Sequence, residues 1–525
     1  MPNKFERRTL LKAMAGVPVL GALGFETLRK LKYDAKNNPR KEIVRELGLD
    51  DLLSSVKPVT TNNGDLIRVG IVGFGVRGAR LAKELGFMEK SRFERELAEE
   101  KETGGGPLKT KLERGNFNVS ITGICDVFDL HAENGLVAAR HDIFTGGDIA
   151  KANPVKRYTR YHDMLAEPSI DAIIIATPDH HHAQMTIDAI NAGKHVYCEK
   201  APVHREDEIL PLYETVRNSD VVYQMGHQNP QNAVFQQARL ILDRGLLGNI
   251  SHIATTTNRN TRTGAWIRHK TGSGKIKPGD ANSIDWKQWL GKAPQVPFSI
   301  ERFYSWARFF EYDTGLYGQL FSHEFDAVNQ LLDLGIPNTV SATGGQYFYK
   351  ELGDMPDVLH TSFEYADKGT TLTYSANLTS SQSRPRTIYG RDASMTIGSD
   401  LTMTPDGSSE RYAGLLEKGL ADPSRPMLEI LEGSDISSPI DAVTSASIKY
   451  YAARGLTRTF IDGTEWDVTQ LHLKEWLDCI RFGGTPSANI EKAFGEAVVI
   501  AMADISYREQ RRTSWDPVNK QIIRI

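Results

Sequence analysis

Several features are scarce in this 525-residue chain, and each scarcity excludes a class of protein. Its three cysteines, Cys125, Cys198 and Cys479, are too few and too scattered for a disulfide framework or a zinc ribbon. The chain also has little excess of either charge. Its net charge is −3, which argues against a nucleic-acid partner. With 40% hydrophobic and 25% charged residues, the composition is that of a globular protein, and the length predicts two or more domains.

A long apolar run near the N-terminus is also lacking, so we expect no membrane span. The soft apolar stretch Ala13–Phe25 is far short of the roughly 20 residues that cross a bilayer. It follows Arg7 and Arg8, and such a pair before a weakly hydrophobic segment resembles a twin-arginine export signal. A frayed basic helix is the alternative. We therefore expect residues 1–30 to be an export signal, residues 31–65 to be a linker, and the protein to be periplasmic.

The most informative stretch is 66–80, LIRVGIVGFGVRGAR. Its apolar, β-branched start predicts a strand buried on both faces, and that strand runs directly into a GxGxxG pattern. In a dinucleotide site the first glycine makes the tight turn, the second lets a pyrophosphate approach, and the third lets the next helix pack on the strand. The phosphates would lie at that helix's N-terminus. A plain tight turn is the alternative. The candidate cofactor-binding residues of this loop are Gly73, Gly75, Val76, Arg77 and Gly78.

A second predicted strand, Val119–Cys125, ends at Asp126. An acidic residue there would accept hydrogen bonds from the adenosine ribose and repel a 2′-phosphate, which favours NAD over NADP. Asp126 lies 48 residues after Gly78 (126 − 78), against roughly 20 in the simplest fingerprint. The segment 86–118, rich in Lys, Glu and Gly, accounts for the excess as an insertion or a loop with a helical extension. An ordinary turn aspartate is the alternative for Asp126.

Polar residues follow three further predicted strands. The strand 170–177 ends in PDHHH, the strand 195–198 ends in EKAP, and the strand near 221–225 continues into Gly226 and His227. Ligands bind beyond the carboxyl ends of parallel strands in open α/β sheets. Three consecutive histidines point in different directions and no HxxxH or acidic partner spacing accompanies them, so we expect no metal site.

Together these motifs resemble the glucose–fructose oxidoreductase / inositol dehydrogenase / MocA (Gfo/Idh/MocA) family. The resemblance begins with GxGxxG, ATPDHHH…AGKHVYCEK and QMGHQ, and it continues past residue 230. There the sequence DWKQWLG resembles a linker motif, GQLFSHEFD the active-site helix, and LDCIR with PSAN the C-terminal signature. It covers roughly residues 66–510, and several ordered motifs are far more specific than one.

The resemblance implies an α/β fold with two parts. A Rossmann NAD-binding domain would occupy residues 66–230, an α/β domain with an open, mostly antiparallel sheet would occupy 231–470, and C-terminal helices in 471–525 would pack back on the core. The second part has strand-like segments at 250–257, 339–348, 360–364, 370–377 and 388–397. We interpret residues 262–282 and 400–439 as long surface loops bordering the substrate pocket.

The resemblance also implies a catalytic site. Lys200 would exchange a proton with the substrate hydroxyl, because burial and a cationic nicotinamide lower the pKa of a lysine. His323 would face the same pocket, with Asp326 on roughly the same helical face; a core histidine is the alternative. Trp306 would add to a polar pocket that suits a polyol. Further residues implied at the nicotinamide and the pocket are Thr177, Pro178, His182, Glu199, His227 and Gln319.

Two departures from the family pattern put the reaction itself in question. The position four residues before His323 is usually aspartate, and here it is Gln319, which can neither take nor relay a proton. The usual Glu-Lys-Pro is Glu-Lys-Ala-Pro, residues 199–202. Both changes leave cofactor binding intact.

Three hypotheses follow for a homo-oligomeric (dimeric or tetrameric) protein that binds NAD and a carbohydrate. The first is hydride transfer to and from a sugar on tightly held, recycled NAD. The second is redox-neutral cleavage of a glycoside through a transient 3-keto sugar. The third is a non-catalytic sugar-binding protein that keeps the oxidoreductase fold. The presence of Lys200 and His323 argues against this third hypothesis.

Overall fold

A computed structural model describes most of the chain. The described residues are 43–49, 59, 64–102, 106–145, 154–260, 275–350, 353–382, 384–398, 400–431, 456–461 and 464–525. The predicted export signal, 1–30, and most of the predicted loop 262–282 lie outside these residues. Among the described helices, none is long and apolar enough to cross a membrane.

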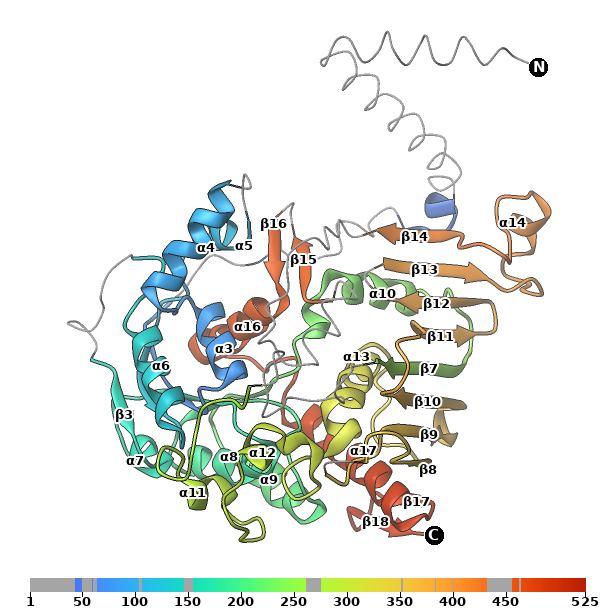
Figure 1. The fold of residues 1–525 in the computed structure, drawn as a ribbon. Coiled ribbons are helices and arrows are strands. Elements are labelled where there is room, and N and C mark those ends of the chain that lie inside the picture. Colours follow the sequence, from blue (N-terminus) through green and yellow to red (C-terminus); the bar gives the residue numbers. More distant parts are fainter. Residues whose placement is uncertain are drawn as a thin grey trace, which may run out of the picture.

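The first sheet contains six parallel strands in the order β3-β2-β1-β4-β5-β6 (Figure 1). Its strands are β1 (Ile67–Val72), β2 (Val119–Cys125), β3 (Lys156–Tyr158), β4 (Ala172–Ile175), β5 (His195–Cys198) and β6 (Tyr223–Met225). The associated helices are α3 (Val76–Leu85), α6 (Asp129–Ala139), α7 (Tyr161–Leu165), α8 (His182–Asn191) and α9 (Ile209–Arg217). This strand order, reversing between β1 and β4, is that of the Rossmann fold, in which dinucleotides bind at the reversal point.

The second sheet contains ten strands in the order β14-β13-β12-β11-β7-β10-β9-β8-β17-β18. All its described pairings are antiparallel except β7 with β10. The strands are β7 (Ile250–Asn258), β8 (Thr339–Gly345), β9 (Val358–Tyr365), β10 (Thr370–Asn377), β11 (Arg386–Gly390), β12 (Ala393–Ile397), β13 (Asp400–Pro405), β14 (Leu428–Leu431), β17 (Thr513–Asp516) and β18 (Gln521–Arg524). A separate hairpin joins β15 (Arg458–Ile461) to β16 (Thr464–Asp467).

Helices fill the space between and around the sheets (Figure 1). They are α4 (Lys90–Glu102), α5 (Pro107–Arg114), α10 (Ala233–Asp243), α11 (Trp286–Leu290), α12 (Ile300–Tyr304), α13 (Ser322–Leu332), α14 (Ala413–Glu417), α16 (Val468–Phe482) and α17 (Ile490–Glu509). Helices α10, α13 and α17 contribute apolar side chains to a core that also includes residues of both sheets, from Val72 and Cys198 to Leu372. The opposite face of the first sheet forms a second core with α3, α6 and α16, centred on the fully buried Trp476.

The predicted fold class is confirmed: a Rossmann part with a parallel sheet, and a second sheet that is mostly antiparallel. The segment 86–118 forms the paired helices α4 and α5, which matches the expected helical extension. The interpretation of 400–439 as a loop bordering the pocket is wrong for its described part. Residues 400–405 and 428–431 form β13 and β14 at the outer edge of the second sheet, away from the pocket. In β13 the side chains of Leu401 and Met403 are buried while the polar residues next to them are not fully buried, which is the alternation of a strand with one face on the core.

Two smaller expectations also change. The segment 388–397, expected as one strand, is the hairpin β11–β12, which turns at residues 391–392. Within the expected linker 31–65, residues 43–46 form a helical turn, and Ile43 and Leu49 are 3% and 1% exposed. These two side chains belong to the shared core, so this part of the chain is packed rather than a free connection.

Candidate active site

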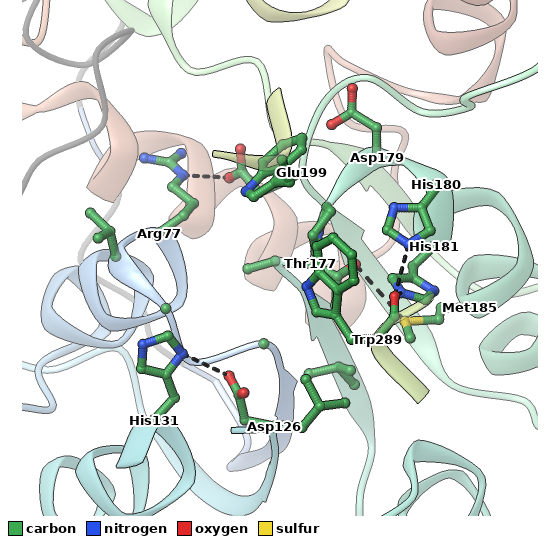
Figure 2. A pocket seen from close by; sticks show the side chains of 18 of the residues that line it. Arg77, Asp126, His131, Thr177, Asp179, His180, His181, Met185, Glu199 and Trp289 are labelled. Carbon is green, nitrogen blue, oxygen red and sulfur yellow. Dashed lines mark hydrogen bonds and ion pairs between the residues drawn. The ribbon is translucent and has the colours of Figure 1, made fainter. Parts of the chain in front are cut away.

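One large pocket of about 1010 Å³ lies at the carboxyl ends of β1, β2, β4 and β5. Its other walls come from the segment 277–307 and from the start of the α13 region. Figure 2 shows side chains from both sides converging on this space, with Arg77, Asp126 and Glu199 facing the glycine-loop half. The cavity is large enough to hold a dinucleotide's reactive half together with a small substrate.

Glycine suits each of the three loop positions for a different structural reason. Gly73 has φ +85°, and a Cβ there would lie 2.6 Å from the Ala176 carbonyl oxygen of β4's end. A Cβ on Gly78 would lie 2.1 Å from the carbonyl oxygen of Gly73, so only glycine lets α3 pack this close. A Cβ on Gly75 would meet nothing in the protein nearer than the His131 ring, at 3.8 Å. Gly75 therefore faces open pocket space, as a pyrophosphate cradle requires.

Asp126 fixes the shape of this loop. Its Oδ2 accepts a hydrogen bond of 2.6 Å from the Phe74 amide, and its Oδ1 accepts one of 2.8 Å from the Phe128 amide. The side chain also lies 3.6 Å from His131 Nδ1 and lines the pocket (Figure 2). Each carboxylate oxygen keeps a second lone pair, so the residue can still accept hydrogen bonds from ribose hydroxyls.

Arg77 and Glu199 connect the glycine loop to the end of β5. Arg77 Nε donates to Glu199 Oε1 at 2.7 Å, and both side chains line the pocket. Arg77 Nη2 is buried and has no hydrogen-bond partner among the described residues. A buried, unpartnered guanidinium nitrogen beside an open glycine and the N-terminus of α3 suits an anionic pyrophosphate. These residues therefore fit an NAD cofactor.

The three consecutive histidines brace the pocket wall. The Nε2 atoms of His180 and His181 lie 2.9 and 2.8 Å from the same carbonyl oxygen, that of Trp289 in α11 (Figure 2). His182 contacts the carbonyl oxygens of Ala201 and Thr177 at 2.6 and 2.8 Å. Within the described residues, no group of three or more His, Cys, Asp or Glu side chains is placed to hold a metal ion.

Lys200 lies at the end of β5, and its peptide bond to Ala201 is cis. Its Nζ donates to Gln319 Oε1 at 2.7 Å. Burial lowers the pKa of Lys200 below its ordinary value, although Asp179 and Glu199 oppose the shift. A lysine with a lowered pKa, beside a pocket that fits nicotinamide, has its neutral, proton-accepting amine available at a lower pH than an ordinary lysine does.

Gln319 enters the pocket from a π-helical turn, Tyr317–Phe321, and His323 enters it from α13, the helix into which this turn leads. Burial lowers the pKa of His323 well below its usual range, and His227 and Lys200 add to the effect. The ring of His323 packs edge-on against that of His227, with centroids 5.0 Å apart. His323 is therefore neutral at physiological pH. Its ring can accept a hydrogen bond from a substrate hydroxyl or donate one to it.

His227 and Asp326 form a layer behind the pocket. His227 Nε2 lies 2.8 Å from Glu496 Oε2, and burial lowers the pKa of His227 to about 4. Asp326 accepts two hydrogen bonds from Gln330, and burial raises its pKa to about 6. Neither side chain lines the cavity, although His323 does and lies on the same helix as Asp326.

The structure thus brings most of the predicted site residues to one pocket. Those that line it are Gly73, Gly75, Val76, Arg77, Asp126, Thr177, Pro178, Glu199, Lys200, Trp306, Gln319 and His323. Four predicted residues lie behind it instead: Gly78 supports the loop, His182 braces two strand ends, and His227 and Asp326 form the rear layer.

Sequence reasoning missed two carboxylates near Lys200. Asp179 lines the pocket directly after the Thr177-Pro178 strand end, and its position after a buried strand was a usable signal. Asp313 precedes the π-helical turn, and its side chain meets Gln319, six residues later. That spacing is not a same-face spacing of an α-helix, so no periodicity pointed to it.

Comparison with known proteins agrees with the Rossmann fold and the NAD-binding geometry described above. Residues 109–227 match the family model GFO_IDH_MocA, described as "Oxidoreductase family, NAD-binding Rossmann fold". These residues are therefore similar to the NAD-binding Rossmann fold of the Gfo/Idh/MocA oxidoreductases. The Gfo/Idh/MocA match begins inside the α4–α5 insertion and ends at His227, so it contains Asp126, Glu199 and Lys200.

Relatives and solved structures extend the likeness. Levoglucosan dehydrogenase of Pseudarthrobacter phenanthrenivorans is 28% identical over 114 residues, which is 19% of this chain and 29% of that protein. The 2,7-anhydro-N-acetylneuraminate hydratase of Escherichia coli is 24% identical over 255 residues, 48% of this chain and 56% of that protein. A levoglucosan dehydrogenase structure in complex with NADH and L-sorbose is similar at a TM-score of 0.54 and 15% identity, covering 88% of this chain and 99% of that one.

The sequence matches are partial. Three uncharacterized oxidoreductases among the relatives are aligned over 45%, 50% and 29% of their lengths, so the chain spans half or less of each. The structural likeness, at 15% identity, establishes the shared fold across both sheets.

Proposed function

We propose that this protein is an NAD-dependent oxidoreductase that acts on a sugar or glycoside by hydride transfer. The observation that carries the proposal is the single cavity in which the glycine loop and the Lys200–Gln319–His323 group meet. NAD held by the loop would supply the hydride acceptor. The chain's own residues would bind the substrate hydroxyl, orient its C–H bond and move its proton.

Lys200 is the proton-transferring group in this proposal. Its buried amine, with a lowered pKa, accepts the hydroxyl proton when the alcohol is oxidised and returns it when the carbonyl is reduced. Neutral His323 orients the same hydroxyl, and Trp306 provides an apolar surface for the face of a sugar ring. Glu199, paired with Arg77, keeps the strand end and the glycine loop at a fixed separation.

The carbohydrate substrate is supported by relatives named levoglucosan dehydrogenase and myo-inositol 2-dehydrogenase, the latter of Thermotoga maritima. Their names describe oxidation of a polyhydroxylated ring. The pocket here, lined by lysine, glutamine and histidine side chains, offers hydrogen bonds of the kind that such a ring needs.

A second function, redox-neutral cleavage of a glycoside, is favoured by two observations. One is the hydratase relative, and the other is Gln319 in the place where the family pattern has aspartate. Transient oxidation at ring C3 would acidify the C2 proton, whose loss would expel the aglycone; addition of water and return of the hydride would complete the cycle. No net oxidant is consumed.

Location gives a reason for recycling the cofactor. If the Arg7-Arg8 segment exports the folded protein to the periplasm, no pool of free NAD is available there, and a bound cofactor must return to its starting state each cycle. We include a homo-oligomer, dimeric or tetrameric, in the proposal; light scattering on the purified protein tests it.

The experiment is an absorbance spectrum of the purified protein followed by turnover without added cofactor. We expect bound NAD(H) and many product molecules per protein. If NADH accumulates one-for-one with product and free NAD must be supplied, recycling is wrong and an ordinary dehydrogenase remains. If the protein binds sugar but forms no product under either condition, the non-catalytic alternative is correct.

A further inference from the structure

Four side chains form a buried chain of contacts on the substrate side of the pocket. Lys200 Nζ donates to Gln319 Oε1 at 2.7 Å. Gln319 Nε2 lies 3.0 Å from both carboxylate oxygens of Asp179 and 2.6 Å from Asp313 Oδ1. Asp179 and Asp313 are each 1% exposed, so water does not screen them from one another.

The contacts determine which way the Gln319 amide points. With its nitrogen toward the two aspartates, every contact pairs a donor with an acceptor. The reverse orientation would set the amide oxygen against two carboxyl groups and the NH₂ group against the Lys200 amine. The aspartates therefore aim the amide oxygen at Lys200.

Like charges repel strongly in a buried site, so two carboxyl groups that share one amide nitrogen favour a state in which one of them holds a proton. The two differ in their partners. Asp179 also accepts hydrogen bonds from the Thr314 hydroxyl at 2.6 Å and the Thr314 amide at 3.2 Å, so its Oδ2 is already surrounded by donors. Asp313 Oδ2 is buried and receives no donor among the described residues, and the Asp313 side chain lies within hydrogen-bonding reach of that of Asp179.

We propose that Asp313 is a protonated positioning residue: its Oδ2–H donates to Asp179, and the pair locks Gln319 so that its oxygen faces Lys200. The inference rests on the proposed function, in which Lys200 transfers the proton. The acid proton of Asp313 stays in place through the cycle, and no bond to it is made or broken.

Charges around the site agree with this assignment. Burial and then the neighbouring Asp179 raise the pKa of Asp313 well above its usual range. The ionisable groups that face Lys200 include Asp179, Glu199, Asp313 and Arg77, and Glu496 also interacts with it electrostatically. With Asp313 neutral, no further negative charge adds to those of Asp179 and Glu199, which already favour the protonated form of Lys200.

The test compares Asp313→Asn with Asp313→Leu in the NAD-loaded protein. Asparagine imitates the protonated acid, since its oxygen can accept from Gln319 and its NH₂ can donate to Asp179, whereas leucine fills the space without either bond. We expect kcat of Asp313→Asn to stay within about threefold of wild type and kcat of Asp313→Leu to fall by about tenfold or more. Bound NAD, measured by absorbance, should be unchanged in both.

An infrared difference spectrum gives a readout that does not depend on turnover. Wild type near pH 7 should show the carbonyl band of a protonated carboxylic acid that Asp313→Asn lacks. Burial also raises the pKa of Glu496, so Glu496→Gln is needed to assign the second such band. Equal loss of kcat in both Asp313 variants, or a wild-type rate in Asp313→Leu, overturns the positioning role.

The two proposals fail in distinguishable ways. If wild type turns over no sugar, the proposed function fails, while the infrared band still decides whether Asp313 holds a proton. If Asp313→Asn loses no carboxylic-acid band relative to wild type, the protonation assignment is overturned even in a fully active protein.

Discussion

Arg77 Nε donates a 2.7 Å hydrogen bond to Glu199 Oε1 and so ties the glycine loop to the strand end that carries Lys200. The two residues are 122 positions apart in the chain. Because both line the pocket, one ion pair links the site that fits the pyrophosphate with the lysine that we propose as the proton-transferring group.

The first prediction concerns this pair. Arg77→Met removes the cation that faces Glu199 and the nitrogen that is free to bind phosphate. We expect NAD to bind about 10- to 100-fold more weakly, because one or two charge-assisted hydrogen bonds are lost. Calorimetric titration of the apo-protein with NAD measures this affinity. The control is Arg68→Met, whose partner Asp171 is 39% exposed, and whose effect on NAD affinity should be negligible. Equal affinities in wild type and Arg77→Met would contradict the assignment.

The second prediction concerns cofactor choice. Asp126 at the end of β2 should make the protein bind NAD more tightly than NADP, because a 2′-phosphate would meet its carboxylate. Asp126→Ala should also weaken NAD itself by about 1–3 kcal/mol, since the Phe74 and Phe128 amides lose their acceptor. The same titration with both nucleotides tests it, and tighter binding of NADP by wild type would sink the assignment.

The third prediction concerns Lys200. Lys200→Met and Lys200→Arg should each lower kcat by about 10²- to 10⁴-fold while NAD remains bound. Because burial lowers the pKa of Lys200, the neutral amine is present at a lower pH than in an ordinary lysine, and oxidation should speed up as pH rises through that pKa. Both variants should lose this rise. A variant with the rise intact would mean that another group is the base.

The fourth prediction concerns stability near the α4–α5 insertion. Glu84 and Lys111 form a buried ion pair at 2.5 Å, and Arg80 also contacts Glu84. Burial opposes ionisation, yet Lys111 and Arg80 lower the pKa of Glu84 to about 2. Since the folded-state pKa is the lower one, the stabilisation exists above pH 4.5 and is lost as pH falls toward 2.

The test of that pair is thermal unfolding of Glu84→Gln. We expect a loss of about 3–5 kcal/mol at neutral pH, because Lys111 is left buried without its anion. Glu94→Gln, which removes an exposed contact to Lys90, should cost less than about 1 kcal/mol. If the two variants lose similar free energies of unfolding, the buried pair stabilises the protein no more than an exposed one.

The sequence predicted those parts of the site that local patterns encode. A buried strand followed by GxGxxG, and polar residues after buried strands, are short-range signals, so the loop, Asp126, Glu199 and Lys200 were identified. The Asp313–Gln319 contact was not, because it depends on a π-helical turn that breaks the 3.6-residue spacing. Strand β13 was missed because only two apolar residues alternate within its polar sequence, and the sheet supplies the rest.

The shared core beneath the two sheets limits how a substrate can enter. Val72 and Cys198 of the first sheet and Leu372 of the second belong to one continuous buried cluster. Swinging the sheets apart would expose that cluster to water, at a cost of about 25 cal/mol for each Å² of apolar surface. The cavity is therefore present without any movement of one sheet against the other, and the proposed substrate would enter a pocket whose walls are already in place.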